Sequence, residues 1–241
     1  MTTMTLTTTR RTAWPVGLGL GSAAGAALVV AGVWNALVQE HVTVSSPPMV
    51  GPQTPPLQTM QAHYRWYATT VPQERSATIL GLIGVAGLVL LTVELRRRLR
   101  DAPVGRGACT AVQAAGTVWI VGALAAMGGH RAVALMATHD NPVQTVNVVA
   151  FTTDMTSDAF NAAAFVLLAV GMLGVATASY GGPRWRALTV LTGLLAAVVA
   201  YGYVASVDSV TTYELGLLAA VLQPIWLVWT GRLLDRSEPT D

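Results

Sequence analysis

ATILGLIGVAGLVLLTVELRRRLR, residues 77–100, is the stretch that decides the fold of this chain. Nineteen residues with a single carboxylate, Glu94, lead directly into four arginines within five positions. About twenty helical residues, rising 1.5 Å each, cross a hydrocarbon core of about 30 Å. The stretch therefore predicts a membrane-spanning helix, and its arginines predict that this helix ends on the cytoplasmic side.

Five further apolar stretches have a similar character, and only 11% of the 241 residues are charged, against about 25% in soluble proteins. The first stretch is about 25 residues long, against roughly 7–15 for the core of a signal peptide, so we expect a retained helix. We predict an all-α bundle of six transmembrane helices that forms a single membrane domain over residues 1–241. The predicted spans are residues 14–38, 77–95, 108–128, 159–180, 187–205 and 215–233.

The arginines are confined almost entirely to one side of these spans. Arginine in short loops marks the cytoplasmic side, so both termini are predicted to lie in the cytoplasm and two longer loops, residues 39–76 and 129–158, outside. We expect these outer loops to be ordered and to cap the bundle. The chain has arginine but no lysine and is rich in alanine and glycine, a composition that suggests a bacterial source with a high-GC genome. The membrane would then be a bacterial inner membrane. The arginines on the predicted cytoplasmic side are Arg10, Arg11, Arg96, Arg97, Arg98, Arg100, Arg106, Arg184, Arg186, Arg232 and Arg236.

The composition excludes several function classes. The chain has no lysine, so it cannot form a retinal Schiff base or a phosphate-binding P-loop. All four histidines fall in predicted loops or at span ends, which argues against haem held inside the bundle. The arginines serve topology, so no nucleic-acid partner is expected. The predicted spans lack mid-membrane carboxylates, which disfavours a proton- or ion-coupled transporter.

Small residues in the first span predict close helix packing. Gly17, Gly21 and Gly25 lie on one face of a helix, where the absent side chains let a second backbone approach. The partner is either another helix of the same chain or, as an alternative, a second copy or another membrane protein. Cys109 is the single cysteine, so it cannot form an internal disulfide, and we expect a small packing residue.

Polar residues within the spans are few and neutral. Asn161 in the fourth span and Gln223 in the sixth are expected to form interhelical hydrogen bonds. Pro224 follows Gln223 and predicts a kink near the middle of the sixth span. A kink beside two amides is also a candidate cavity for an uncharged ligand.

Histidines and acidic residues gather on the predicted outer side. Imidazole and carboxylate groups are ligands for divalent metals and also serve in acid–base catalysis. On a continuous helix Asp154 and Asp158 would share a face, whereas His130 and His139 would point about 180° apart. The candidate metal ligands are His63, His130, His139, Asp154 and Asp158, and the candidate catalytic residues are His139, Asp140, Asp154 and Asp158.

Simpler roles account for the same residues. Asp154, Ser157 or Asp158 would cap the fourth helix, and residues 140–142 form a sequence typical of turns. His63 would belong to an aromatic belt with Trp66 and Tyr67. Three functions stay open: a protein acting by helix packing or outer-loop contacts, a membrane enzyme with an outward site for a lipid or envelope precursor, and a carrier of uncharged or lipophilic compounds.

Overall fold

The computed structural model describes residues 16–45, 57–99, 101–139, 141–178, 180–205 and 209–236. This part of the chain is helical, as predicted, and contains six helices. Two predictions fall outside the described residues: the catalytic candidate Asp140 and the close helix packing around Gly17. The helices are α1 Val16–Ser45, α2 Leu57–Arg98, α3 Pro103–Thr138, α4 Val143–Thr177, α5 Pro183–Ala205 and α6 Ser209–Arg236.

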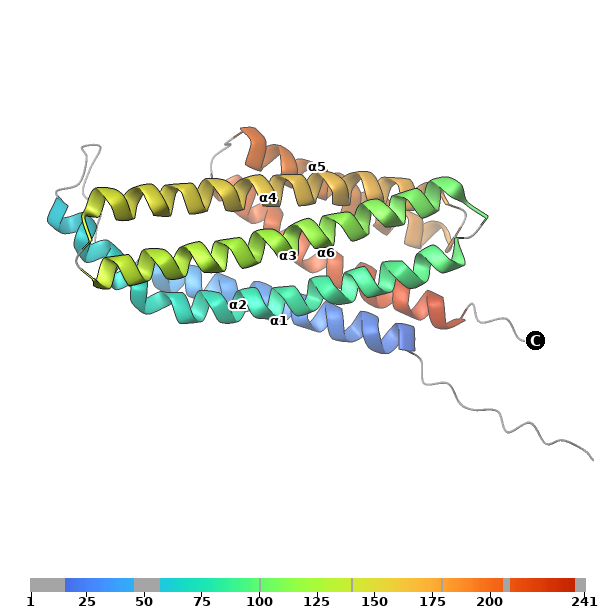
Figure 1. Ribbon diagram of the computed structural model, residues 1–241. Helices are drawn as coiled ribbons and strands as arrows, with labels where there is room; N and C mark the ends of the chain where they lie inside the picture. Colours follow the sequence, from blue (N-terminus) through green and yellow to red (C-terminus); the bar gives the residue numbers. More distant parts are fainter. Residues whose placement is uncertain are drawn as a thin grey trace, which may run out of the picture.

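The helices form a closed ring in chain order. Each helix packs on its neighbours in sequence, and α1 closes the ring by packing on α6 (Figure 1). The α2–α3 and α4–α5 connections lie at the same end of the bundle as the start of α1 and the end of α6 (Figure 1). We call this arginine-rich end the proximal end and the opposite end, which holds the α3–α4 connection, the distal end.

Four helical segments are long and apolar enough to cross a membrane, as expected of a membrane protein. An apolar face lets each of them meet lipid, and intrahelical hydrogen bonds satisfy the backbone there. A shorter apolar segment, residues 19–34, lies in α1. The four segments are Arg75–Arg98, Pro103–Thr138, Val143–Thr177 and Pro183–Ala205.

The predicted long loops are largely helical, which corrects the sequence analysis. Instead of a capping loop over residues 129–158, α3 continues to Thr138 and α4 begins at Val143. Likewise, most of residues 39–76 belongs to α1 and α2. Hydropathy marks where a helix leaves lipid, not where the helix ends, and between residues 143 and 158 no glycine or proline breaks the helix. Pro142 supplies the break, in an extended conformation directly before α4.

The main hydrophobic core fills the proximal and central parts of the ring. Leu91, Leu95, Cys109 and Met172 are completely buried there, and Cys109 has the packing role predicted for it. Glu94 pairs at 3.2 Å with both Arg97 and Arg98, one turn along α2, at the proximal surface. These three charged groups lie at the proximal end of α2, and apolar packing holds the ring between the two ends.

Glycines bring α1 close to its two neighbours. A Cβ added to Gly21 would meet the backbone carbonyl of Leu227 on α6, and one added to Gly25 would meet the Pro224 carbonyl oxygen at 3.2 Å. On α2, a Cβ at Gly87 would meet Ala24 of α1. The glycine face of α1 is thus occupied within the monomer, so a dimer through this helix would need a different face.

Candidate functional site

The distal ends of three helices form a separate packed unit, which we call the distal extension: residues 57–74 of α2, 129–138 of α3 and 143–158 of α4. At 1.5 Å per residue, the 36 residues of α3 and 35 of α4 span about 50 Å, some 20 Å more than a hydrocarbon core. The extension has its own small core of Val133, Ala137 and Val146, apart from the main core.

Tyrosines of α2 tie this extension together. The Tyr64 hydroxyl donates a 2.6 Å hydrogen bond to Oδ1 of Asn147 on α4, and Tyr64 and Tyr67 pack against the small core. Burial raises the pKa of the Tyr64 phenol, and the negative charge of Asp154 raises it further. The phenol therefore remains a neutral donor at physiological pH. A tyrosine at this position has its ring in the core and its hydroxyl at the polar edge.

His130 and Asp154 come together across the α3–α4 contact. Nε2 of His130 lies 3.6 Å from Oδ1 of Asp154, and the His130 ring packs edge-on to Tyr67 with ring centroids 5.9 Å apart. The His130 side chain is 28% exposed and that of Asp154 70%, so water reaches the pair. Beside them the helices are at close range, since a Cβ added to Gly129 would meet the Thr153 side chain. The pair therefore joins three helices.

A polar stripe runs along one face of α4. At about 100° per residue, Asn147, Asp154, Asp158 and Asn161 fall within an arc of about 60°. Asp158 lies within electrostatic range of Asp154 and of Tyr203 on α5, so the stripe faces the interior side of the ring. The first three of these side chains are exposed and Asn161 is half-buried. The stripe thus runs from solvent towards the interior of the bundle.

Aromatic side chains end this stripe. Phe165 lies seven residues after Asp158, on nearly the same face of α4. Its ring centroid is 5.3 Å from that of Trp119 on α3 and 6.1 Å from that of Tyr203 on α5. The buried main core begins here. The polar face is therefore open at the distal end and closed by a three-ring stack within the bundle.

The two other histidines predicted as site residues, His139 and His63, do not join the pair. His139, at the end of α3, is exposed, and its Nδ1 contacts the Leu135 carbonyl oxygen at 2.8 Å. His63 packs against the rings of Tyr64 and Trp66, and burial lowers the pKa of its imidazole. Within the described chain, no three His, Cys, Asp or Glu side chains are grouped as metal ligands.

Helix capping is the simpler explanation that the structure overturns. Asp154 and Asp158 lie eleven or more residues inside α4, which begins at Val143, so neither caps the helix. The turn at residues 141–142 is as predicted: the Asn141 backbone and side-chain amides both donate to the Met136 carbonyl. The kink candidate in α6 is packed rather than open, since Gln223 is buried and Pro224 contacts Gly25.

Asn147 and the contacts of Tyr64 and Tyr67 were not predicted from the sequence. Asn147 stands among valines, and its only signal is its seven-residue spacing from Asp154, which becomes visible once the segment is known to be helical. No protein-family model, curated protein sequence or solved structure matches the chain.

Proposed function

We propose that the chain is a six-span protein of a bacterial inner membrane, with both termini in the cytoplasm, that acts through contacts made by its distal extension outside the membrane. The arginines of the proximal connections support this orientation, because short-loop arginines stay in the cytoplasm. The segments counted as the first and sixth spans are α1 and α6, which complete the ring on either side of the four apolar segments.

One observation carries this proposal: three helices continue together about 20 Å beyond the bilayer thickness and pack around a core of their own. A chain that only needed to cross the membrane would gain nothing from this extension. A preformed helical surface, by contrast, presents side chains to a partner at low entropic cost.

The test is site-specific photo-crosslinking in cells. A benzophenone side chain replaces Thr145, which is exposed on the extension, and the matched control replaces Val198, which is exposed on α5. We expect a discrete protein adduct from position 145 and only lipid or no adduct from position 198. Equal, diffuse labelling from both positions would contradict the proposal.

The His130–Asp154 contact favours a second candidate, a membrane enzyme. A carboxylate beside an imidazole can orient the ring and stabilise its protonated form, which is the arrangement used for a general base. In this role His130 would take a proton from a lipid or envelope precursor at the exposed distal edge, and Asp154 would position the ring. The carrier has less support, because the aromatic stack closes the polar face within the bundle.

The enzyme candidate is tested by incubating the purified protein with vesicles of bacterial lipid extract and recording lipid masses. His130→Gln and Asp154→Asn are the variants, and His139→Gln is the matched control at an exposed histidine. Catalysis requires a product that both variants lose and the control keeps. If all four proteins leave the lipid profile unchanged, that candidate is rejected.

A further inference from the structure

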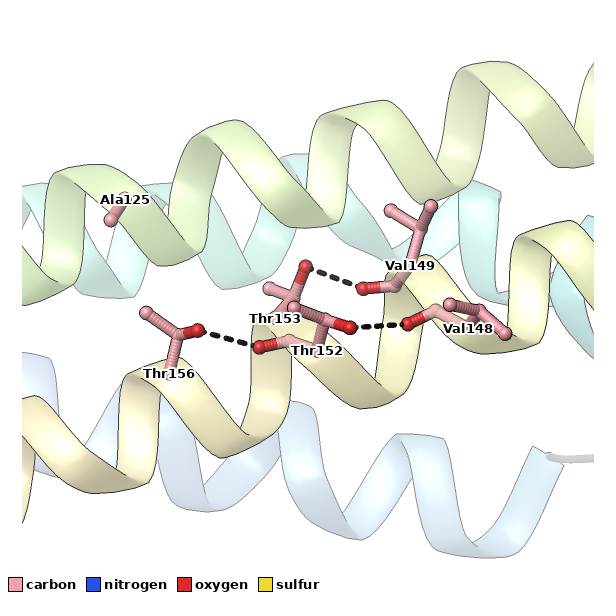
Figure 2. Close-up of a pocket in the computed structure, with 6 residues that line it drawn as sticks. All are labelled: Ala125, Val148, Val149, Thr152, Thr153 and Thr156. Carbon is pink, nitrogen blue, oxygen red and sulfur yellow. Dashed lines mark hydrogen bonds between the residues drawn. The ribbon is translucent and has the colours of Figure 1, made fainter.

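A shallow groove of about 260 Å³ lies between α3 and α4, on the side of α4 opposite the polar stripe. Figure 2 shows Ala125 on α3 across from the α4 side chains. The small side chain of Ala125 leaves the space open. The groove is lined by Ala125, Val148, Val149, Thr152, Thr153 and Thr156.

The three threonines of the groove offer no free hydrogen-bond donor. Each hydroxyl donates to the carbonyl oxygen four residues earlier, Thr152 to Val148 and Thr153 to Val149 at 2.8 Å, and Thr156 to Thr152 at 2.7 Å (Figure 2). Their methyl groups and the valines make up the rest of the lining. The groove therefore suits a hydrocarbon chain without polar groups better than a ligand that needs hydrogen-bond donors.

The surface around the groove is apolar and continues towards the proximal end. Val121 and Leu124 of α3 are 48% and 55% exposed, and Val148 and Met155 of α4 are 64% and 56% exposed. Val121 and Leu124 lie on the membrane-crossing part of α3 and face lipid, whereas Val148 and Met155 lie on the distal extension just beyond it. The groove is continuous with this lipid-facing surface.

The groove begins where α4 leaves the hydrocarbon core and lies just outside it. About twenty residues counted back from Thr177, the end of α4, reach residue 158. Thr152 and Thr156 then lie within about 10 Å beyond the hydrocarbon boundary. An alkyl chain in the groove would thus extend out of the hydrocarbon core between α3 and α4, with its head group further along the distal extension.

We infer that this groove binds one acyl chain of a phospholipid from the outer leaflet. The acyl chain enters from the bilayer along the exposed face of α3 and α4, and its methylene groups cover the apolar lining of the groove. Recognition is of the chain and not of the head group. The inference depends on the membrane location of the protein, but on neither the partner contacts nor the reactivity of His130.

The experiment measures the lipid retained by the purified protein in mild detergent, by native mass spectrometry. The probe is phosphatidylglycerol with 16- and 18-carbon chains. Ala125→Phe fills the groove, and Val121→Phe, one turn away on the same lipid-facing side of α3, is the matched control. We expect the Ala125→Phe protein to retain the lipid roughly tenfold more weakly, as for the loss of about two buried methylenes. The control retains it as the unmodified protein does.

A second arm uses only the unmodified protein, so the inference stays testable if the filled variant does not fold. Phosphatidylethanolamine with the same chains should compete with the probe, whereas soluble glycerophosphoglycerol, the head group without chains, should not. Competition by the soluble head group, absence of retained lipid, or equal retention by the Ala125→Phe and unmodified proteins would each overturn the inference.

Discussion

Neighbouring helices are linked by buried neutral hydrogen bonds at the proximal end of the bundle and by partly exposed ionisable groups at the distal end. At the proximal end the indole N–H of Trp185 on α5 donates to Thr230 on α6 at 3.0 Å, and that of Trp226 on α6 donates to Thr189 on α5 at 2.9 Å. These four side chains are almost completely buried and carry no charge. At the distal end the links use a histidine, a carboxylate and a phenol at partly exposed positions.

The difference reflects the local solvent. Neutral donors and acceptors can be satisfied in a dry core, whereas an ionisable group there would be costly. Where water reaches the helices, charged groups are tolerated and can respond to pH or to a partner. We therefore expect the proximal end to be the more rigid part of the molecule and the distal end to be the part that responds to pH or to a partner.

The largest effect is expected from Trp226→Ala. This change removes a fully buried indole from the contact between α5 and α6 and leaves a cavity, at a cost of about 3–5 kcal/mol. Thermal unfolding of the protein in detergent would measure this loss of stability. Trp226→Phe keeps an aromatic ring but loses the bond to Thr189 and part of the buried indole volume, so it should cost less, about 1–3 kcal/mol. Equal, small effects of both changes would mean that the cluster does not hold the two helices.

Close packing of α1 on α6 gives the next largest effect. Gly21→Ala places a Cβ against the Leu227 carbonyl, so we expect a destabilisation of about 1–3 kcal/mol. Gly19→Ala, on the same helix, meets nothing within 4 Å and should be neutral or slightly stabilising. The same unfolding measurement compares the two variants. A loss of stability in both would point to helix bending rather than to the α1–α6 contact.

Tyr64→Phe probes the distal extension with a smaller, local effect. The variant loses the hydrogen bond to Asn147, worth about 1 kcal/mol, while its ring stays in the small core. Hydrogen exchange should become faster in the distal parts of α2 and α4 and stay unchanged around Trp185. Faster exchange throughout the bundle would contradict the separation of the two ends.

The smallest effect is a pH dependence that arises from His63. Burial lowers the pKa of this imidazole below its ordinary value of 6.5, so the folded extension favours the neutral form. Its stabilising contribution is therefore present above pH 6.5 and is lost as the pH falls through the lower, folded value. The side chain is only partly buried, which limits the effect.

His63→Gln should remove this loss. Protection factors for residues 60–70, corrected for intrinsic exchange, would be compared at about pH 7.5 and pH 5, with the exposed His139→Gln as the matched control. An unchanged pH response in the His63→Gln protein would show that another group is responsible.

Sequence patterns predicted the apolar helices well but predicted the site only in part. Hydropathy depends only on neighbouring residues in the sequence, so residues 77–95 predict a membrane helix whatever packs around them. The end of a helix depends on caps and breakers instead, and Pro142 provides such a signal whereas the membrane boundary does not. That is why the distal extension was predicted as loops.

Contacts between side chains far apart in the sequence could not be predicted for a similar reason. His130 and Asp154 were both candidates, but their pairing depends on how α3 and α4 align. That alignment is set by close contacts such as Gly129 on Thr153. The sequence favoured His139, a candidate for both catalysis and metal binding, over His130, a candidate for metal binding alone. The structure reverses this order, because His130 contacts Asp154 whereas His139 is exposed at the end of α3.

The orientation of the distal extension is the central claim, and cysteine labelling tests it most directly. In a Cys109→Ala background, His139→Cys places a thiol at the exposed distal tip and Gly182→Cys places one at the exposed α4–α5 connection. A membrane-impermeant maleimide added to intact cells should label position 139 and leave position 182 unlabelled until the cells are lysed. Labelling of position 182 and not of position 139 in intact cells would reverse the orientation and contradict the account.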